Sequence, residues 1–332
     1  MNGTHPGGSG AVGVAVVGYG GAGRQHADAL RDAADARVVA VVETDPGAAA
    51  RAREAGLAVR ALEEVLADDA VRVVALCLPP GARAGVAEAA VAAGRHLLLE
   101  KPPARTPDEL TGLLTLARSG GVLAAVMFQH RFALPEALRS ADPGRFAGAV
   151  ASLTVSRARP EAHYRQAGWR SDPRDALGGV TAHLGVHYLD LACQLLGTPR
   201  TVTPLARTDA APGIDTQLCG HVVFASGARL SVAVTSRSPA RFEQLTVLGT
   251  DAWMEMRSGA VTGEIDGRPL AGPARPASAL RGEVYRELCG AVTGRSSLAL
   301  AALSRGRGVT EVLDGLLGGS VLDDPRLAGV AR

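Results

Sequence analysis

Lys101 is the only lysine in this sequence. The chain of 332 residues has 35 Lys plus Arg, and all but Lys101 are Arg. Asn occurs once and Ile twice, whereas Ala, Gly, Arg and Pro are abundant, as expected of a GC-rich genome. Arginine supplies a positive charge, but it cannot supply a compact ammonium or a readily shifted pKa. We therefore expect Lys101 in a functional site, with chance survival as the alternative.

A histidine pair is the second candidate for chemistry. His183 and His187 are four residues apart in the helical stretch 181–196, so both side chains would lie on one helix face. Histidine can transfer protons near neutral pH. Two alternatives stay open, namely hydrogen-bonded interior histidines and a zinc site built on His-x-x-x-His. Because no Glu follows His183 and no Cys ligand is near, we expect no metal.

A glycine-rich motif near the start of the chain points to a nucleotide. It follows the apolar run 12–17, opens a helical stretch and has the pattern G-x-G-x-x-G. It reads Gly18-Tyr19-Gly20-Gly21-Ala22-Gly23. Gly18 would allow a tight turn, Gly20 a close approach to a pyrophosphate, and Gly23 packing of the helix on the strand. The helix N-terminus would offer its N–H groups and positive dipole end to the phosphates.

Glu43 indicates which dinucleotide would bind. The second apolar run, 37–43, ends at this residue, about twenty positions after the last glycine of the motif. A carboxylate there can accept hydrogen bonds from both ribose hydroxyls of adenosine and would repel a 2′-phosphate. The sequence thus predicts NAD as cofactor, with NADP possible. A flavin, or a nucleotide without a redox role, stays open as an alternative.

The elements that position these residues change in kind along the chain. Between residues 12 and 128, apolar runs without polar alternation separate helical stretches, which predicts parallel strands buried on both faces. Ligands bind beyond the carboxyl ends of such strands, so Lys101, which follows the run 96–100, would face the nicotinamide region. Pro102 disfavours a helical backbone at Lys101.

After about residue 145 the apolar runs alternate partly with polar residues and are separated by turn signals. This pattern predicts an antiparallel sheet of about five or six strands with helices on one face, and a Pro- and Gly-rich loop at 267–276. The expected fold is α/β, an N-terminal Rossmann doubly wound parallel sheet plus a C-terminal α/β domain with a large open, mainly antiparallel sheet. The expected boundaries are a flexible tail at 1–10, a dinucleotide-binding domain at 11–130 and a substrate-binding and oligomerisation domain at 131–332.

Composition excludes several classes of partner. The chain is 47% hydrophobic and 20% charged with a formal net charge of +2, which lacks the basic footprint of a nucleic-acid binder. No apolar run reaches the roughly 20 residues that cross a membrane. The four cysteines form no close pair, which fits a reducing cytoplasm. We expect a cytoplasmic protein with a small-molecule substrate, no nucleic acid and no membrane.

With these residues in view, the chain resembles the glucose–fructose oxidoreductase, inositol 2-dehydrogenase and rhizopine-catabolism family (Gfo/Idh/MocA) over nearly its whole length. The resemblance depends on the glycine motif and on several further short motifs. They are His26 and Leu30, Leu78-Pro79-Pro80, Ala93-Gly94-Arg95-His96, Glu100-Lys101-Pro102, Gln129-His130-Arg131-Phe132, Trp169-Arg170 and the run ending Gly185-Val186-His187-x-x-Asp190.

The resemblance implies hydride transfer between NAD(P) and a carbonyl or hydroxyl of a sugar, nucleotide sugar or cyclitol, in bacterial carbohydrate or specialised metabolism. It also implies assembly through the open sheet, so we expect a homodimer or homotetramer. The family's acid–base group is a Lys, an Asp and a His four residues later. Lys101 and His187 match, whereas His183 stands where the Asp would be, so His183 shares the proton chemistry or the substrate is not a simple polyol.

Further candidates carry less support from the residues themselves. Leu78, Pro79 and Glu100 are expected beside the cofactor. Substrate contacts are expected from Arg131, Tyr164, Trp169 and Arg170, with loop packing or salt bridges as the alternative. Two other functions stay open: reduction of a C=N bond in a specialised metabolite, and a cofactor-binding sensor without turnover.

Overall fold

The protein is described here by a computed structural model that covers residues 10–160, 162–165, 172, 175 and 177–318. The chain folds into two compact units. Unit 1 consists of the chain up to Ala104, Asp108–Ala133 and Arg275–Gly306, and unit 2 of Arg105–Pro107, Leu134–Ala274 and the chain from Arg307 onward. Residues 1–9 of the expected tail lie outside the described residues.

Within the described chain, unit 1 has a parallel sheet of five strands in the order β2-β1-β3-β4-β5. The strands are β1 (Val12–Val17), β2 (Ala36–Val42), β3 (Val73–Leu76), β4 (His96–Leu99) and β5 (Ala124–Val126). Every residue of β1 and β3 is buried, which is why these strands show no polar alternation. The predicted Rossmann sheet is confirmed.

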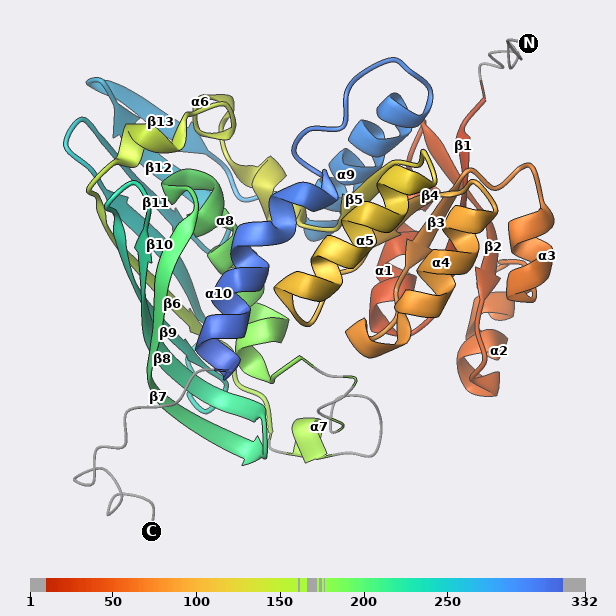
Figure 1. The fold of residues 1–332 in the computed structure, drawn as a ribbon, viewed down its shortest axis with the longest axis horizontal. Helices are drawn as coiled ribbons and strands as arrows, with labels where there is room; N and C mark the ends of the chain where they lie inside the picture. The colour runs from red at the N-terminus through yellow and green to blue at the C-terminus, as the bar shows by residue number, and fades with distance from the viewer. Residues whose placement is uncertain (1–9, 161, 166–171, 173–174, 176, 319–332) are drawn as a thin grey trace. The chain divides into compact units, whose positions relative to one another are not determined.

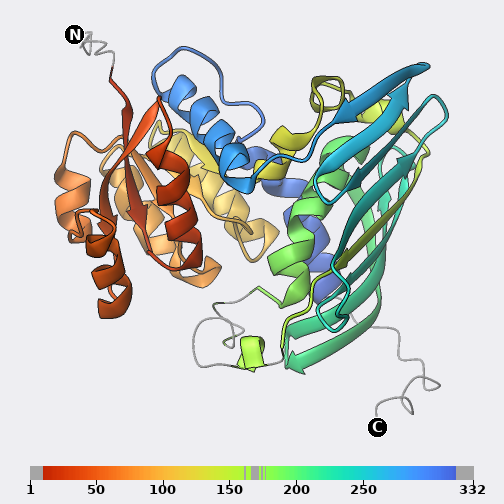
Figure 2. The ribbon, with the colours of Figure 1, turned by 180° about the vertical axis from the view of Figure 1, so that it is seen from behind.

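Helices cover both faces of this sheet. Helices α1 and α9 lie on one face, and α4 and α5 on the other (Figures 1 and 2). The helices of unit 1 are α1 (Gly21–Arg31), α2 (Pro46–Glu54), α3 (Leu62–Ala67), η1 (Pro80–Ala82), α4 (Ala84–Ala92), α5 (Pro107–Ser119), η2 (Gln129–Ala133), α9 (Ala277–Val292) and η5 (Leu303–Gly306).

The segment Arg275–Gly306 differs from the sequence-based boundaries, which placed it in the second domain. Its helix α9 packs against α1 and η2 and buries Val284, Tyr285 and Leu288 there. An amphipathic pattern shows that a helix has an apolar face, but it does not show which domain covers that face.

Unit 2 has a mainly antiparallel sheet, with eight strands among the residues described, in the order β13-β12-β11-β10-β6-β9-β8-β7. Only the β6–β9 pair is parallel among the pairs of this sheet in the described chain. The strands are β6 (Val150–Ser156), β7 (Pro199–Ala211), β8 (Ile214–Phe224), β9 (Arg229–Thr235), β10 (Phe242–Leu248), β11 (Ala252–Arg257), β12 (Ala260–Ile265) and β13 (Arg268–Gly272). The predicted open sheet is confirmed.

The expected strand number was too low. The segment 267–276, expected as a loop, contains edge strand β13, and the sequence analysis also missed β12 and the opposite edge strand β7. Pro269 contributed to the error at β13, since it was taken with its neighbours in 267–276 as a sign of a loop, whereas proline is tolerated on edge strands.

One face of the unit 2 sheet is covered by α8 (Val186–Leu196) and α10 (Arg307–Gly318), which Figure 2 shows side by side. The other face carries exposed apolar residues. The remaining helices of unit 2 are α6 (Glu136–Arg139), η3 (Pro143–Phe146), α7 (Ala162–Arg165) and a π-helix, η4 (Thr181–Gly185).

Candidate active site

The glycine-rich loop joins β1 to α1. Two of its glycines are required by the fold itself, and a third, Gly20, is not. Gly18 has φ +90°, and a Cβ on Gly23 would lie 1.9 Å from the carbonyl oxygen of Gly18. Both must be glycine for the turn itself. A Cβ on Gly20 would meet no described atom within 4 Å, although Gly20 is the N-cap of α1 and has no side-chain cap. A bare loop at an uncapped helix N-terminus is the surface that a pyrophosphate needs.

Glu43 lies beside this loop. It follows β2, and its Oε2 accepts the Tyr19 N–H at 2.6 Å. Its Oε1 accepts the N–H groups of Thr44 and Asp45 at 2.7 and 2.8 Å. The carboxylate is therefore held against the loop where the adenosine ribose of a dinucleotide would lie.

Lys101 follows β4, at the same carboxyl edge of the sheet as the glycine loop. It is half-buried, and its N–H donates to Glu100 Oε2 at 3.0 Å. The other carboxylate oxygen, Oε1, pairs with His26 Nε2 at 2.9 Å. Burial alone raises the pKa of Glu100, but the His26 hydrogen bond and the charges of His26, Lys101 and Arg281 lower it to about 2. The carboxylate next to Lys101 is thus ionised at any physiological pH.

Arg83 ties two strand-end loops together. It is 3% exposed, and it donates from Nε to the Leu78 carbonyl at 2.9 Å and from a terminal nitrogen to the Pro102 carbonyl. Burial lowers the pKa of this guanidinium to about 10, with the charge of Glu100 opposing the shift. The loop after β3, with Leu78 and Pro79, is thereby fixed to the loop that carries Lys101. Sequence analysis missed Arg83, whose surroundings Gly-Ala-Arg-Ala-Gly gave no signal.

The two histidines of unit 2 lie on adjoining helices. His183 is in the π-helix η4, where its N–H donates to the Gly179 carbonyl at 3.1 Å, and His187 is in the first turn of α8. Both side chains are half-buried. A π-helical turn within an α-helix is rare and is often found at functional sites.

Asp215 on β8 holds the start of this segment, and sequence analysis missed it. It is fully buried, its Oδ1 accepts the Gly179 N–H at 2.5 Å, and its Oδ2 accepts the Thr181 N–H and hydroxyl at 3.0 and 2.7 Å. A Cβ on Gly179 would lie 1.9 Å from the Asp215 carbonyl oxygen, which explains a glycine there. Asp215 thus caps the histidine-bearing segment from a distant strand. A lone acid at the start of an apolar strand, Ile214-Asp215-Thr216, was the available signal.

Comparison with known proteins gives the family. The description "Oxidoreductase family, NAD-binding Rossmann fold" matches residues 12–128, and "GFO/IDH/MocA C-terminal domain" matches residues 137–255. The chain belongs to the Gfo/Idh/MocA family. Its unit 1 is an NAD-binding Rossmann domain, and the uncapped loop at Gly20 with Glu43 beside it fits such a cofactor.

The curated relatives of this chain differ in the share of their own length that aligns with it. An uncharacterized oxidoreductase of Schizosaccharomyces pombe is 31% identical over 167 residues, 49% of this chain and 44% of that protein. A second one from the same organism is matched over 39% of its length, so the chain spans about two fifths of these two relatives. D-xylose 1-dehydrogenase (NADP(+)) 2 of Haloferax volcanii is 28% identical over 285 residues, 81% of this chain and 86% of that protein.

Solved structures share the fold. The WlbA dehydrogenase of Chromobacterium violaceum, in complex with NADH and UDP-GlcNAcA, has a TM-score of 0.77 and 23% identity, over 93% of each chain. At this identity the likeness shows that both units of this Gfo/Idh/MocA protein have a known arrangement of elements.

Two of the residues expected to contact substrate, Arg131 and Tyr164, are buried in the structure. Arg131 is 1% exposed, donates to the main-chain carbonyls of Leu300 and Arg305, and stacks on the Phe128 ring with its guanidinium carbon 4.9 Å from the centroid. It therefore holds η2 to the segment around η5, and its expected substrate contact stays a prediction. Tyr164 is 1% exposed and packs against Ile214, again as interior. Trp169 and Arg170 lie outside the described residues.

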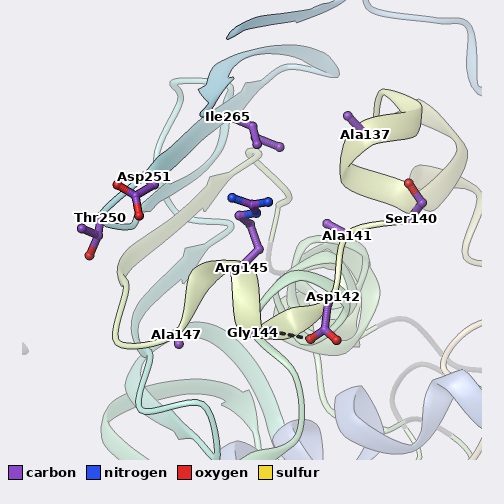
Figure 3. A pocket seen from close by; sticks show the side chains of 10 residues that line it. All are labelled: Ala137, Ser140, Ala141, Asp142, Gly144, Arg145, Ala147, Thr250, Asp251 and Ile265. Atoms are coloured by element: carbon purple, nitrogen blue, oxygen red, sulfur yellow. Dashed lines mark hydrogen bonds between the residues drawn. The ribbon is translucent and has the colours of Figure 1, made fainter. Parts of the chain in front are cut away.

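A separate cavity of about 620 Å³ lies in unit 2 (Figure 3). Its lining contains none of the predicted site residues, and Arg145 on its wall is paired with Asp266 at 2.6 Å. The lining residues are Ala137, Ser140, Ala141, Asp142, Gly144, Arg145, Ala147, Thr250, Asp251 and Ile265. This cavity has no part in the candidate site.

The described residues offer neither a cluster of metal ligands nor a membrane-spanning helix. They contain no group of three or more His, Cys, Asp or Glu side chains placed to hold a metal ion. None of the helices described is both long and apolar enough to cross a membrane.

Proposed function

We propose that this chain catalyses reversible hydride transfer between NAD(H) and a carbon bearing a hydroxyl or carbonyl group in a sugar, nucleotide sugar or cyclitol. The observation that carries the proposal is that the only lysine of the chain follows β4, at the sheet edge that also bears the glycine-rich loop and Glu43. The family and the names of its relatives, among them a D-xylose dehydrogenase, support the substrate class.

The nicotinamide, when bound, accepts or supplies the hydride. The chain's own residues then act on the substrate oxygen. The ammonium of Lys101 donates a hydrogen bond to this oxygen and stabilises the negative charge that develops on it. His187 accepts the proton when a hydroxyl is oxidised and returns it when a carbonyl is reduced. Lys101 belongs to unit 1 and His187 to unit 2, so their joint action is a proposal that depends on the match of each residue to the family motif.

Glu43 supports NAD over NADP. Its carboxylate is fixed against the glycine-rich loop by three main-chain N–H groups. A fixed negative charge at the ribose would repel a 2′-phosphate, since the carboxylate cannot turn away without losing these bonds.

One observation favours a second candidate function. His183 stands where the family motif has Asp, so the motif of this chain lacks the carboxylate that would accompany Lys101 and His187. A cofactor-binding sensor without turnover, or an enzyme that reduces a C=N bond, would be compatible with this change.

The test is a panel of substrates with both cofactors. The protein is incubated with NAD or NADP and an aldose, a cyclitol or a nucleotide sugar, and with NADH or NADPH and an imine, while nicotinamide absorbance is followed. Oxidation of a polyol that is lost in Lys101→Ala supports the proposal. Tight NADH binding without turnover of any compound would favour the sensor, and turnover of the imine alone would favour the C=N reductase.

A further inference from the structure

A row of hydrogen-bonded side chains in unit 1 leads to Lys101, and the proposed reaction does not use it. Tyr285 on α9 has its hydroxyl 2.6 Å from His26 Nδ1, and His26 on α1 has its Nε2 2.9 Å from Glu100 Oε1. Glu100 Oε2 accepts the main-chain N–H of Lys101. The three side chains are 1%, 0% and 6% exposed, so water has almost no access to the row.

The direction of the hydrogen bond between His26 and Glu100 follows from chemistry. The Glu100 carboxyl has a pKa of about 2 and can only accept, so His26 Nε2 must carry a hydrogen. Burial raises the pKa of the Tyr285 hydroxyl well above its usual value, so this group stays protonated and can donate to His26 Nδ1. The row therefore runs from the Tyr285 hydroxyl through the His26 imidazole to the Glu100 carboxylate, with Nε2 as the donor to the carboxylate.

Burial of a carboxylate and an imidazole in a core is energetically unfavourable. Each polar group costs free energy on burial unless it is fully hydrogen-bonded, and apolar side chains of similar size would fill the same volume without that cost. The row also joins separate elements, since His26 is on the helix that begins at the glycine-rich loop and Tyr285 is 259 residues away on α9. It thus links the cofactor helix and α9 to the backbone at Lys101.

We propose that His26 and Tyr285 are positioning residues that act through Glu100 to hold Lys101 in one orientation. The inference rests on the proposed function, in which the Lys101 ammonium must meet the substrate oxygen. A fixed Glu100 carboxylate holds the Lys101 main chain by a hydrogen bond, and its charge stabilises the neighbouring ammonium. Loss of the Tyr285 hydroxyl frees the imidazole to rotate, and the carboxylate then loses its defined partner.

The single lysine allows a test that does not depend on turnover. Reductive methylation with isotope-labelled formaldehyde labels Lys101 and the amino terminus only, and the two are told apart by their titration ranges. The Lys101 resonance reports its surroundings in the intact protein. The variants are Tyr285→Phe, His26→Leu and His26→Gln, whose amide can still donate to Glu100 and accept from Tyr285.

Glu287→Gln is the matched control. Glu287 is on the same helix as Tyr285, but among the described residues it accepts only the main-chain N–H groups of Ala299 and Ala301, which the glutamine oxygen can also accept. We expect its Lys101 resonance and rates to equal those of the wild type.

For Tyr285→Phe we expect a kcat about tenfold lower with nearly unchanged KM, because misplacement of a catalytic group lowers the rate and leaves binding intact. The Lys101 resonance should move in Tyr285→Phe and in His26→Leu, and His26→Gln should restore both the rate and the resonance in large part. A folded Tyr285→Phe protein with the wild-type resonance would overturn the inference. If the wild type turns over no compound of the panel, the proposed function fails, but the resonance still decides whether the row holds Lys101.

Discussion

The lysine segment of unit 1 and the histidine segment of unit 2 are both anchored by a buried carboxylate, but in different ways. Glu100 precedes Lys101 in the chain and is paired with His26 in a row of side chains. Asp215 is on a distant strand and accepts only main-chain and hydroxyl donors of Gly179 and Thr181. The first anchor holds the main chain of the candidate catalytic lysine, and the second holds the start of the segment that bears the two histidines.

The charges around the two carboxylates explain their opposite titration. Burial raises the pKa of both, but Glu100 accepts a hydrogen bond from His26 and has the charges of His26, Lys101 and Arg281 nearby, so its pKa falls to about 2. For Asp215, burial outweighs the Thr181 and Gly179 hydrogen bonds, and the charge of Asp209 adds to it, so its pKa stays raised. Both carboxylates fix main chain, but cations nearby lower the pKa of Glu100, whereas the neutral donors around Asp215 do not offset its burial.

The largest effect is expected from the lysine itself. Lys101→Ala should lower turnover by about 10²–10³-fold, the range found when one donor to a developing oxyanion is removed. Lys101→Arg should rescue poorly, because a planar guanidinium cannot take the place of a compact ammonium. Steady-state rates and NADH binding are measured on the same proteins. Near-normal turnover in Lys101→Ala with intact NADH binding would mean that the lysine is structural.

Asp215→Asn tests the anchor of unit 2. The amide nitrogen would face an N–H group that the carboxylate now accepts, which leaves buried donors without partners and costs about 1–3 kcal/mol of unfolding free energy. Denaturant unfolding gives this value. NADH binding should be unchanged, since the cofactor residues are in unit 1; a loss of NADH affinity as large as the loss of stability would refute separate anchoring.

The comparison also shows what sequence could predict. Lys101 was found because it is the only lysine and follows a recognisable apolar run, and Glu43 and the glycine loop because of their places relative to such runs. The long-range contacts that hold the two site segments were not found, because His26 and Tyr285 are 259 residues apart and Asp215 is 36 residues from Gly179. Such contacts depend on which strands and helices become neighbours. Edge strand β13 was missed for a related reason, since its proline is compatible with a strand only at a sheet edge.

A smaller effect, on cofactor preference, is expected from substitution of Glu43 in unit 1. Glu43→Ser combined with Thr44→Arg removes the repulsion of a 2′-phosphate and supplies a partner for it, so the preference should move towards NADP by about tenfold, or roughly 1.4 kcal/mol. Binding of NADH and NADPH is measured by fluorescence titration. The wild type should bind NADH more tightly; tighter binding of NADPH by the wild type would contradict the role of Glu43.

The two sheets differ in their exposed faces, and this difference predicts assembly. Helices cover both faces in unit 1, whereas Val150, Leu248 and Trp253 form one cross-strand row in unit 2 that is 62%, 53% and 41% exposed. Arg229 and Glu264 are the paired residues at its two ends. An apolar row rimmed by opposite charges is self-complementary about a two-fold axis, which supports the expected homodimer or homotetramer.

Trp253→Ser should therefore weaken assembly by about tenfold, while the exposed Ser231→Ala on β9 serves as its control. Light scattering over a dilution series gives the mass. A wild-type mass near the 33.9 kDa monomer at working concentration would reject assembly altogether.

The central claim is that Lys101 and His187 act on one reacting oxygen, and a double-mutant cycle tests it most directly. The kcat of the wild type, Lys101→Ala, His187→Ala and the double variant is measured with one substrate and saturating NAD. Because residues that act as a unit are non-additive, the double variant should be little slower than the slower single variant. If the two losses instead multiply, Lys101 and His187 act independently and the account is wrong.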